Sequence, residues 1–145
     1  MVLRRAIFAF FREIWPHGVV WFEAVGEVVV LEESQIDPLS TISGSGPAYV
    51  FLLIEELTAT AERMGFTAEQ AATMVQGTFR GACELLAADS AGESPAGPAE
   101  LRRRVTSPKG TTEQAIGVLQ ESRLGEIFDR ATAAALARAQ ELAAG

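Results

Sequence analysis

Residues 43–64 read SGSGPAYVFLLIEELTATAERM, and this segment decides the fold. Its Ser/Gly turn places Pro47 at the first position of a helix, where proline is favoured because no helical partner exists for an amide hydrogen there. The apolar residues that follow occupy more than one helical face, and Gly65 provides a C-terminal stop. We therefore predict a long helix from Pro47 to Met64, with its first half deeply buried within the chain or between subunits.

Further helices are predicted on the C-terminal side of this segment. Thr67 and Gln70 form a capping box, which predicts a helix to about Ala88 with Cys83 as a small buried residue. A stretch rich in Pro, Gly and Ser at residues 89–98 is expected to be a surface loop. Beyond it we predict one or two helical turns at 99–105, a helix at about 113–121 capped by Thr111 and Gln114, and a last helix at 124–143.

On the N-terminal side, the β-branched run Glu27–Glu33 predicts one strand, and Ser34 is expected to cap a short turn that contains Pro38. A single strand is not stable alone. It must pair with a sheet that this chain scarcely provides, or with another copy of the chain. The sequence therefore predicts a mainly α fold with one residual N-terminal β-strand.

Residues 1–18, MVLRRAIFAFFREIWPHG, superficially suggest a signal peptide, but Arg12 and Glu13 interrupt the apolar run and no small-residue cleavage site follows. Leu3, Ile7 and Phe10 recur at helical spacing, so we predict a short amphipathic helix. Three interpretations stay open: a helix that covers apolar surface or fills a partner's groove, attachment to a membrane surface, and an atypical start left by truncation of a longer gene.

The composition fits one globular domain or a piece of a larger protein, with 145 residues of which 48% are hydrophobic and 21% charged. Apolar stretches end well before the roughly 18 to 20 residues that a bilayer span needs, so a transmembrane span is ruled out. For the N-terminal helix we favour the role of covering apolar surface or filling a partner's groove, and therefore expect no membrane partner. The net charge of -7, with Arg102–Arg104 as the only basic run, disfavours nucleic-acid binding. Cys83 is the only cysteine, which fits a reducing compartment, and we expect a cytoplasmic protein.

Few side chains are suited to catalysis or metal binding. His17 is the only histidine and lies in a Pro-His-Gly turn, which disfavours Ser-His-Asp catalysis and multi-histidine metal sites, so no metal is expected. Gly44-Ser45-Gly46 matches neither the dinucleotide fingerprint G-x-G-x-x-G nor the hydrolase motif G-x-S-x-G. It can bind an anion or simply cap the helix that follows.

The loop at residues 106–112, TSPKGTT, is dense in hydroxyls and lies directly before a predicted helix. Such a loop presents several N–H and O–H donors to one point, which suits a carboxylate or a phosphate. The residues alone leave two interpretations open, ligand binding and plain helix capping.

Several motifs together closely resemble pyrroline-5-carboxylate reductase. They are AVGEVV at 24–29, SGSGPAY at 43–49, and PAELR at 98–102 leading into VTSP at 105–108 and GTT at 110–112. The resemblance covers about Phe22 to Leu142 in order and at the family's spacing. The combination is highly specific, although each motif alone is not, and it favours the ligand-binding interpretation of the loop.

The resemblance implies a helical dimerisation domain of the 6-phosphogluconate dehydrogenase C-terminal-like type. In that family an N-terminal Rossmann domain binds NADPH or NADH, the helical domain forms an interlocked dimer, and the active site lies between them. Residues 34–145 are then the helical dimerisation and substrate-binding domain, whereas residues 1–33 are an unmatched helix plus the residual strand of a truncated dinucleotide domain. The partners implied are a homodimer or higher homo-oligomer and a small-molecule substrate.

The family's reaction transfers a hydride from the nicotinamide of NADP or NAD to the C=N carbon of 1-pyrroline-5-carboxylate and yields L-proline. Because the dinucleotide domain is outside the resemblance, we expect the chain to be inactive alone. The alternatives are a catalytically inactive helical dimerisation module and an interaction or surface-bound protein that acts through its N-terminal helix.

The resemblance also implies roles for site residues. Ser107 and the backbone amides near Gly110 and Thr111 hold the substrate carboxylate, and the hydroxyl of Thr112, the catalytic candidate, faces the ring nitrogen. The pocket near the nicotinamide is supported by Ser43, Gly44, Ser45, Gly46 and Pro47.

Lys109 departs from the family, which usually has glycine at this position. If the position needs a positive φ, lysine costs of order 1 kcal/mol and reshapes the loop. A cationic side chain is alternatively an additional partner for the substrate carboxylate. We favour a tolerated variation that points to solvent.

Overall fold

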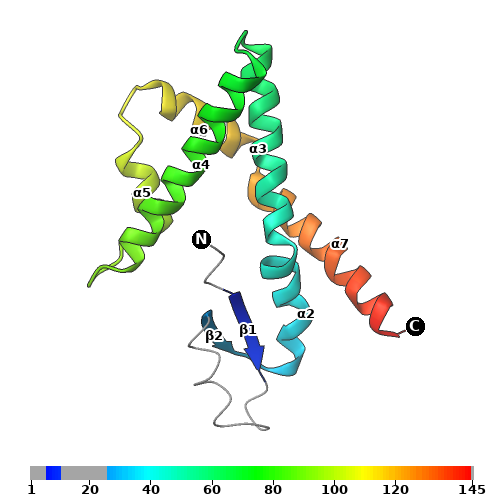
Figure 1. The fold of residues 1–145 in the computed structure, drawn as a ribbon. Coiled ribbons are helices and arrows are strands. Elements are labelled where there is room, and N and C mark those ends of the chain that lie inside the picture. The colour runs from blue at the N-terminus through cyan, green and yellow to red at the C-terminus, as the bar shows by residue number, and fades with distance from the viewer. Residues whose placement is uncertain (1–5, 11–25, 145) are drawn as a thin grey trace. The chain divides into compact units, whose positions relative to one another are not determined.

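The computed structural model describes residues 6–10 and 26–144. Figure 1 shows that the described chain is mainly helical, which confirms the predicted fold class. The contacts within the chain divide it into two compact units. One consists of residues 1–48 and 128–145, and the other consists of residues 49–127.

The first unit contains two short strands, β1 (Ala6–Phe10) and β2 (Gly26–Val30). They pair in parallel, from Ala6 opposite Gly26 to Phe10 opposite Val30. β2 confirms the predicted strand. The helix predicted for the N-terminus is wrong at β1, because a short apolar run fits either period and β2 offers it hydrogen-bond partners. The rest of that predicted helix, with His17, lies outside the described residues.

Helical structure begins before Ser34. The 3-10 turn η1 (Glu33–Gln35) is capped by Glu32, whose amide donates to Gln35 Oε1 over 3.0 Å, so Ser34 is not the cap. The short helix α2 (Ile36–Leu39) follows. The next five residues form the π-helical turn η2 (Ser40–Gly44), closed by a 3.0 Å bond from the Ser45 amide to the Ser40 carbonyl. The Ser/Gly turn expected at residues 43–47 is therefore π-helical backbone up to Gly44.

Helices α3 (Gly46–Arg63) and α4 (Ala68–Ser90) are close to the predicted elements. Gly65, two residues after the end of α3, adopts a φ of 99°, which is the left-handed conformation that glycine permits at a helix end. The capping box at the start of α4 is confirmed, because Gln70 N donates to Thr67 Oγ1 over 3.2 Å and Thr67 N donates to Gln70 Oε1 over 3.0 Å.

Three more helices complete the described chain, and all three begin near their predicted positions: α5 (Gly97–Arg104), α6 (Thr111–Glu121) and α7 (Leu124–Ala144). α4 packs against α5. The surface loop between them is shorter than expected, because α4 continues to Ser90 and α5 already begins at Gly97.

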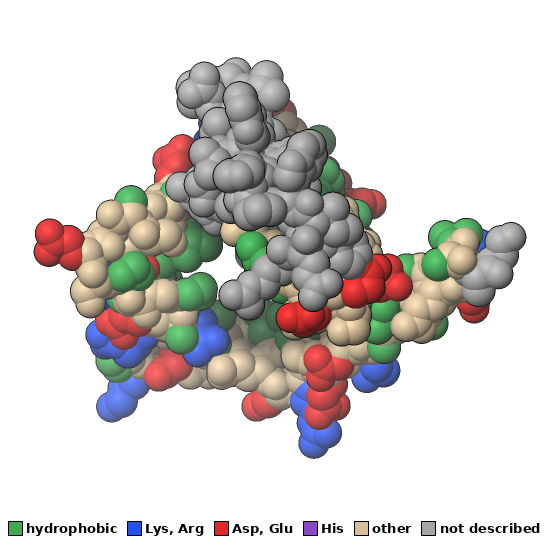
Figure 2. Space-filling model, turned by 90° about the horizontal axis from the view of Figure 1, so that it is seen from below, with side chains coloured by type: hydrophobic (Ala, Val, Ile, Leu, Met, Phe, Trp, Pro, Cys, Tyr) green, Lys and Arg blue, Asp and Glu red, His purple; other side chains and the backbone are tan. Residues whose placement is uncertain are grey.

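Very little apolar surface is buried in the single chain. Among the hydrophobic residues that the structure describes, only Ala71 and Val75 of α4 are buried. The first half of α3 is not buried within the single chain, since Phe51 is 68% exposed and Leu52 55% exposed, and its burial between subunits stays a prediction. Cys83 is also exposed, so its expected burial is wrong for this chain. On the face shown in Figure 2, hydrophobic side chains reach the surface beside charged ones.

Within residues 6–10 and 26–144, no helix is long and apolar enough to cross a membrane. The expected cytoplasmic location stays a prediction.

Candidate functional site

The loop at residues 106–112 is a tight turn followed directly by α6. The amide of Gly110 donates to the carbonyl oxygen of Ser107 over 3.0 Å, which closes a four-residue turn. Pro108 occupies the second position of this turn, and Lys109, with a φ of 61°, occupies the third. This is the pattern of a type II turn, in which proline suits the second residue and the third needs a positive φ.

Several hydrogen-bond donors at this turn have no partner in the described part of the chain. Thr111 and Thr112 are the first residues of α6, so their amides have no carbonyl to bond within the helix. The N-cap is Gly110, which has no side chain to take their place. The hydroxyls of Ser107, Thr111 and Thr112 also form no hydrogen bond among the described residues, and all three residues are exposed. Free donors at the positive end of a helix suit an anion.

The backbone amide of Gly110 closes the turn, whereas the resemblance implies that it helps to hold the substrate carboxylate. Its amide is used by the Ser107 carbonyl, so the amides left for a ligand are those of Thr111 and Thr112. A Cβ added at Gly110 would lie 3.0 Å from the Ser107 carbonyl oxygen, which is tighter than a relaxed contact allows. Glycine at this position therefore lets the turn close.

Lys109 meets the condition under which it was expected to strain the loop. Its φ of 61° lies in the left-handed region, which glycine adopts freely and lysine does not. Its side chain is exposed and forms no ion pair within residues 6–10 and 26–144, in agreement with an orientation toward solvent.

Glu113, the third residue of α6, contacts this turn and was not identified from the sequence. The predicted capping box of Thr111 and Gln114 does not form. Instead Glu113 Oε2 accepts a hydrogen bond from the backbone amide of Lys109 over 2.7 Å. An acidic residue in the first helical turn was the available signal. Glu113 and Pro108 also line part of an open groove of 470 Å³ beside the turn.

The second predicted segment, Ser43 to Pro47, has fewer free donors. Ser43 and Gly44 belong to η2, and the Ser43 hydroxyl donates to the Leu39 carbonyl over 3.2 Å. Gly46 and Pro47 are the first residues of α3. Ser45 lies between the two helices, and its hydroxyl has no partner among the described residues. The two predicted segments fall in different compact units.

A model of the family described as "Pyrroline-5-carboxylate reductase dimerisation" matches residues 33–142, a range that contains both segments and all of α3 to α6. The chain belongs to this family. It corresponds to the C-terminal dimerisation domain of pyrroline-5-carboxylate reductases, which confirms the resemblance found in the motifs.

Relatives support the same assignment. The pyrroline-5-carboxylate reductase of Pseudomonas aeruginosa is 44% identical over 121 residues, which cover 83% of this chain and 42% of the relative. The structure of the Coxiella burnetii reductase superimposes with a TM-score of 0.83 at 38% identity, over 96% of this chain and 52% of that one. The Plasmodium falciparum reductase, with NADP bound, shares the fold with a TM-score of 0.71 at 24% identity, covering 90% of this chain and 54% of its own. The chain thus spans about half the length of these reductases.

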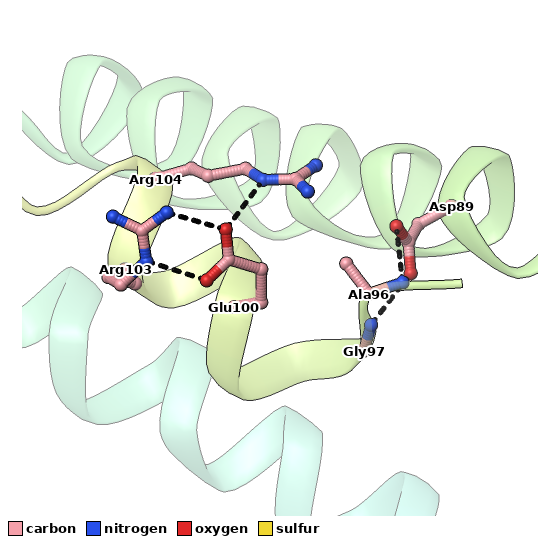
Figure 3. Close-up of polar contacts among 6 residues, drawn as sticks. All are labelled: Asp89, Ala96, Gly97, Glu100, Arg103 and Arg104. Carbon is pink, nitrogen blue, oxygen red and sulfur yellow. Dashed lines mark hydrogen bonds and ion pairs between the residues drawn. The ribbon is translucent and has the colours of Figure 1, made fainter. Parts of the chain in front are cut away.

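Electrostatic contacts order the segment of this dimerisation domain that leads into the turn (Figure 3). Both oxygens of the Asp89 carboxylate accept backbone hydrogen bonds at the start of α5, from Ala96 over 3.1 Å and from Gly97 over 2.9 Å. The Gly97 and Ala96 amides lower the pKa of Asp89 because they stabilise its charged form. Asp89, at the end of α4, thereby ties the loop between the helices to the start of α5.

Glu100 forms ion pairs with two of the three adjacent arginines. Its carboxylate accepts from Arg103 Nε over 2.6 Å and from Arg104 Nε over 3.0 Å. The hydrogen bond from Arg103, followed by that from Arg104, lowers the pKa of Glu100 from 4.5 to about 2. Arg102 is the member of the basic run that takes no part in this cluster.

The residues of this chain do not by themselves fit a dinucleotide. The only paired glycines, Gly44 and Gly46, lie at the junction of two helices and not between a strand and a helix, and they lack the third glycine of the fingerprint. No cluster of three metal-ligating side chains is found within the described ranges.

Proposed function

We propose that this chain is the dimerisation and substrate-binding part of a pyrroline-5-carboxylate reductase, which reduces 1-pyrroline-5-carboxylate to L-proline in proline biosynthesis with NADPH or NADH. The observation that carries the proposal is the turn at Ser107–Thr112. It combines a closed turn, with Lys109 in the left-handed conformation, with hydroxyls and amides that have no partner among the described residues at the start of an 11-residue helix.

The proposed roles follow from the chemistry of the substrate, a ring that carries a carboxylate and a C=N bond. The Ser107 hydroxyl and the amides of Thr111 and Thr112 hold the carboxylate, because charged acceptors form the stronger hydrogen bonds and the helix dipole favours a negative charge there. The Thr112 hydroxyl faces the ring nitrogen, to which a hydroxyl can donate or from which it can accept. The chain's contribution to catalysis is thus to orient the ring.

The bound nicotinamide supplies the hydride in this reaction. Because the fingerprint for a dinucleotide is not found in this sequence, we propose that turnover requires a dinucleotide-binding domain besides these residues. Residues 43–47 support the pocket near the nicotinamide in this proposal, with Ser45 as the residue whose hydroxyl is free to do so.

We also propose that the chain forms a homodimer or a higher homo-oligomer. The support comes from α3, on which five large apolar side chains are more than 40% exposed in the single chain: Val50, Phe51, Leu52, Leu53 and Leu57. Burying such a patch against a second copy removes apolar surface from water. The same observation favours the alternative function, a dimerisation module that assembles but does not bind substrate.

Calorimetric titration of the purified chain with L-proline, and then with NADPH, tests the proposal together with a turnover assay. We expect L-proline to bind while NADPH binding and turnover are absent. A folded dimer in sedimentation equilibrium that binds no L-proline would instead support the assembly-only module. A folded monomer at micromolar concentration would contradict the homo-oligomer.

A further inference from the structure

Two hydrogen bonds hold Lys109 in its left-handed conformation. One lies on its C-terminal side, from the Gly110 amide to the Ser107 carbonyl over 3.0 Å. The other is made by Lys109 itself, whose amide donates to Glu113 Oε2 over 2.7 Å. The second bond spans four residues and ties the turn to the first turn of α6.

This tie matters because of the residue at position 109. A glycine populates positive φ about as readily as negative φ, so a turn with glycine there needs no added restraint. A lysine prefers negative φ, so its left-handed state at 61° persists only where neighbouring contacts favour it. The Glu113 carboxylate is the contact that bonds Lys109 directly.

We propose that Glu113 is a positioning residue: its carboxylate oxygen restrains Lys109, and thereby the turn that aims the donors of Ser107, Thr111 and Thr112 at the ligand carboxylate. This role rests on the proposed function of the turn. Glu113 acts through the Lys109 backbone and does not itself contact the ligand.

The acceptor oxygen and the charge of Glu113 act in opposite directions. The oxygen orders the turn, whereas the negative charge repels a ligand carboxylate bound at the same helix start. Glu113→Gln keeps a carbonyl acceptor of the same reach and removes the charge, so L-proline binds at least as tightly as to the native chain. Glu113→Ala removes the acceptor as well, and binding falls by roughly fivefold, since a share of the chains no longer has the turn preformed.

Lys109→Gly provides the decisive second variant. With glycine at 109 the turn closes without the tie, so Glu113→Ala has little effect in that background. The four chains, native, Glu113→Ala, Lys109→Gly and the double variant, form a cycle in which the two changes are not additive. A merely structural loss at Glu113 would weaken binding equally in both backgrounds. Glu121 is an exposed glutamate at the last position of α6, and Glu121→Ala is the matched control for net charge.

The experiment measures L-proline binding by calorimetry and the proton shift of the Lys109 amide by NMR for every variant. We expect weaker binding and a moved Lys109 signal in Glu113→Ala, rescue by Gln at 113 or Gly at 109, and native behaviour in Glu121→Ala. Equal binding in all four chains of the cycle would overturn the role of Glu113 and leave the proposed function intact. Absence of L-proline binding in the native chain, with the Lys109 signal still dependent on Glu113, would overturn both the proposed function and this role.

Discussion

Two segments of this chain are rich in glycine, proline and hydroxyl residues, and both run into a helix: Ser43–Pro47 into α3 and Ser107–Thr112 into α6. In the first, helical backbone continues to Gly44 and the Ser43 hydroxyl is bonded to the Leu39 carbonyl. In the second, the backbone turns sharply at Lys109, and the hydroxyls of Thr111 and Thr112 have no partner among the described residues.

The difference shows that a segment can contain many hydrogen-bond donors and still leave few of them free to bind a ligand. Serine and threonine within a helix bond back to carbonyls three or four residues earlier, and this satisfies them locally. A left-handed residue followed by a helix start leaves amides and hydroxyls unpaired. For this reason we propose that the ligand binds at the second segment and that the first has a supporting role.

The largest expected difference between the two segments comes from substituting alanine for one glycine in each. Gly110→Ala forces a Cβ to within 3.0 Å of the Ser107 carbonyl and opens the turn, so L-proline binding should fall by roughly tenfold or more. Nothing lies within 4 Å of a Cβ added at Gly46, so Gly46→Ala should leave binding nearly unchanged. Calorimetry of both variants checks this, and equal losses would show that the two segments contribute alike.

Removal of a hydroxyl should have the next largest effect. Thr112→Ala is expected to weaken L-proline binding by about fivefold, because it deletes one hydrogen bond to a charged ligand, whereas Thr112→Ser should keep most of the affinity. Ser43→Ala is the matched control, since its hydroxyl is already bonded to its own helix. In a chimera that carries a family dinucleotide domain, unchanged turnover of Thr112→Ala would contradict the role given to Thr112.

Substituting glycine for Lys109 tests whether the positive φ at this position costs stability. Lys109→Gly should raise the free energy of unfolding by roughly 0.5–1 kcal/mol, the cost of a positive φ less the added freedom of glycine in the unfolded chain. Lys109→Ala, which keeps a Cβ, should give no such gain. Urea denaturation of the three chains measures this, and a stabilised alanine variant would show that the lysine side chain and not its φ is responsible.

The smallest effect is expected from low pH on the stability of α5, the helix that leads into the second segment. The pKa of Glu100 is lowered from 4.5 to about 2 by Arg103 and Arg104, so its contribution to stability is present above pH 4.5 and is lost as the pH falls toward 2. The Gly97 and Ala96 amides lower the pKa of Asp89 in the same direction. Both residues are only partly buried, and solvent screens their contacts, so the change is small.

Glu100→Gln should therefore reduce the slope of unfolding free energy against pH between 4.5 and 2. Glu93→Gln, in the loop between α4 and α5 and outside this cluster, is the control and should retain the native slope. An identical slope in Glu100→Gln and the native chain would show that the Arg103 and Arg104 contacts do not stabilise the fold.

Local signals in the sequence were reliable where one residue decides the backbone. The Thr67–Gln70 capping box and the stop at Gly65 were both predicted correctly, since each depends on contacts within a few residues. The signals failed where competing local solutions exist. Thr111 with Gln114 was an equally good capping box by sequence, but Glu113 bonds to Lys109 instead. At Ala6–Phe10 the same apolar residues fit a helix or a strand, and pairing with β2 decided between them.

The sequence by itself determined the helical class, the family motifs and the position of the candidate turn, because helix periodicity, caps and glycine-containing turns are encoded in short stretches. Only the three-dimensional structure showed that β1 forms, that the first half of α3 stays exposed in the single chain, and that Glu113 accepts a hydrogen bond from the Lys109 amide. Each of these depends on which partner a group finds in space. The spacing of residues along the chain limits which partners a group can reach, but the three-dimensional fold decides which of them it contacts.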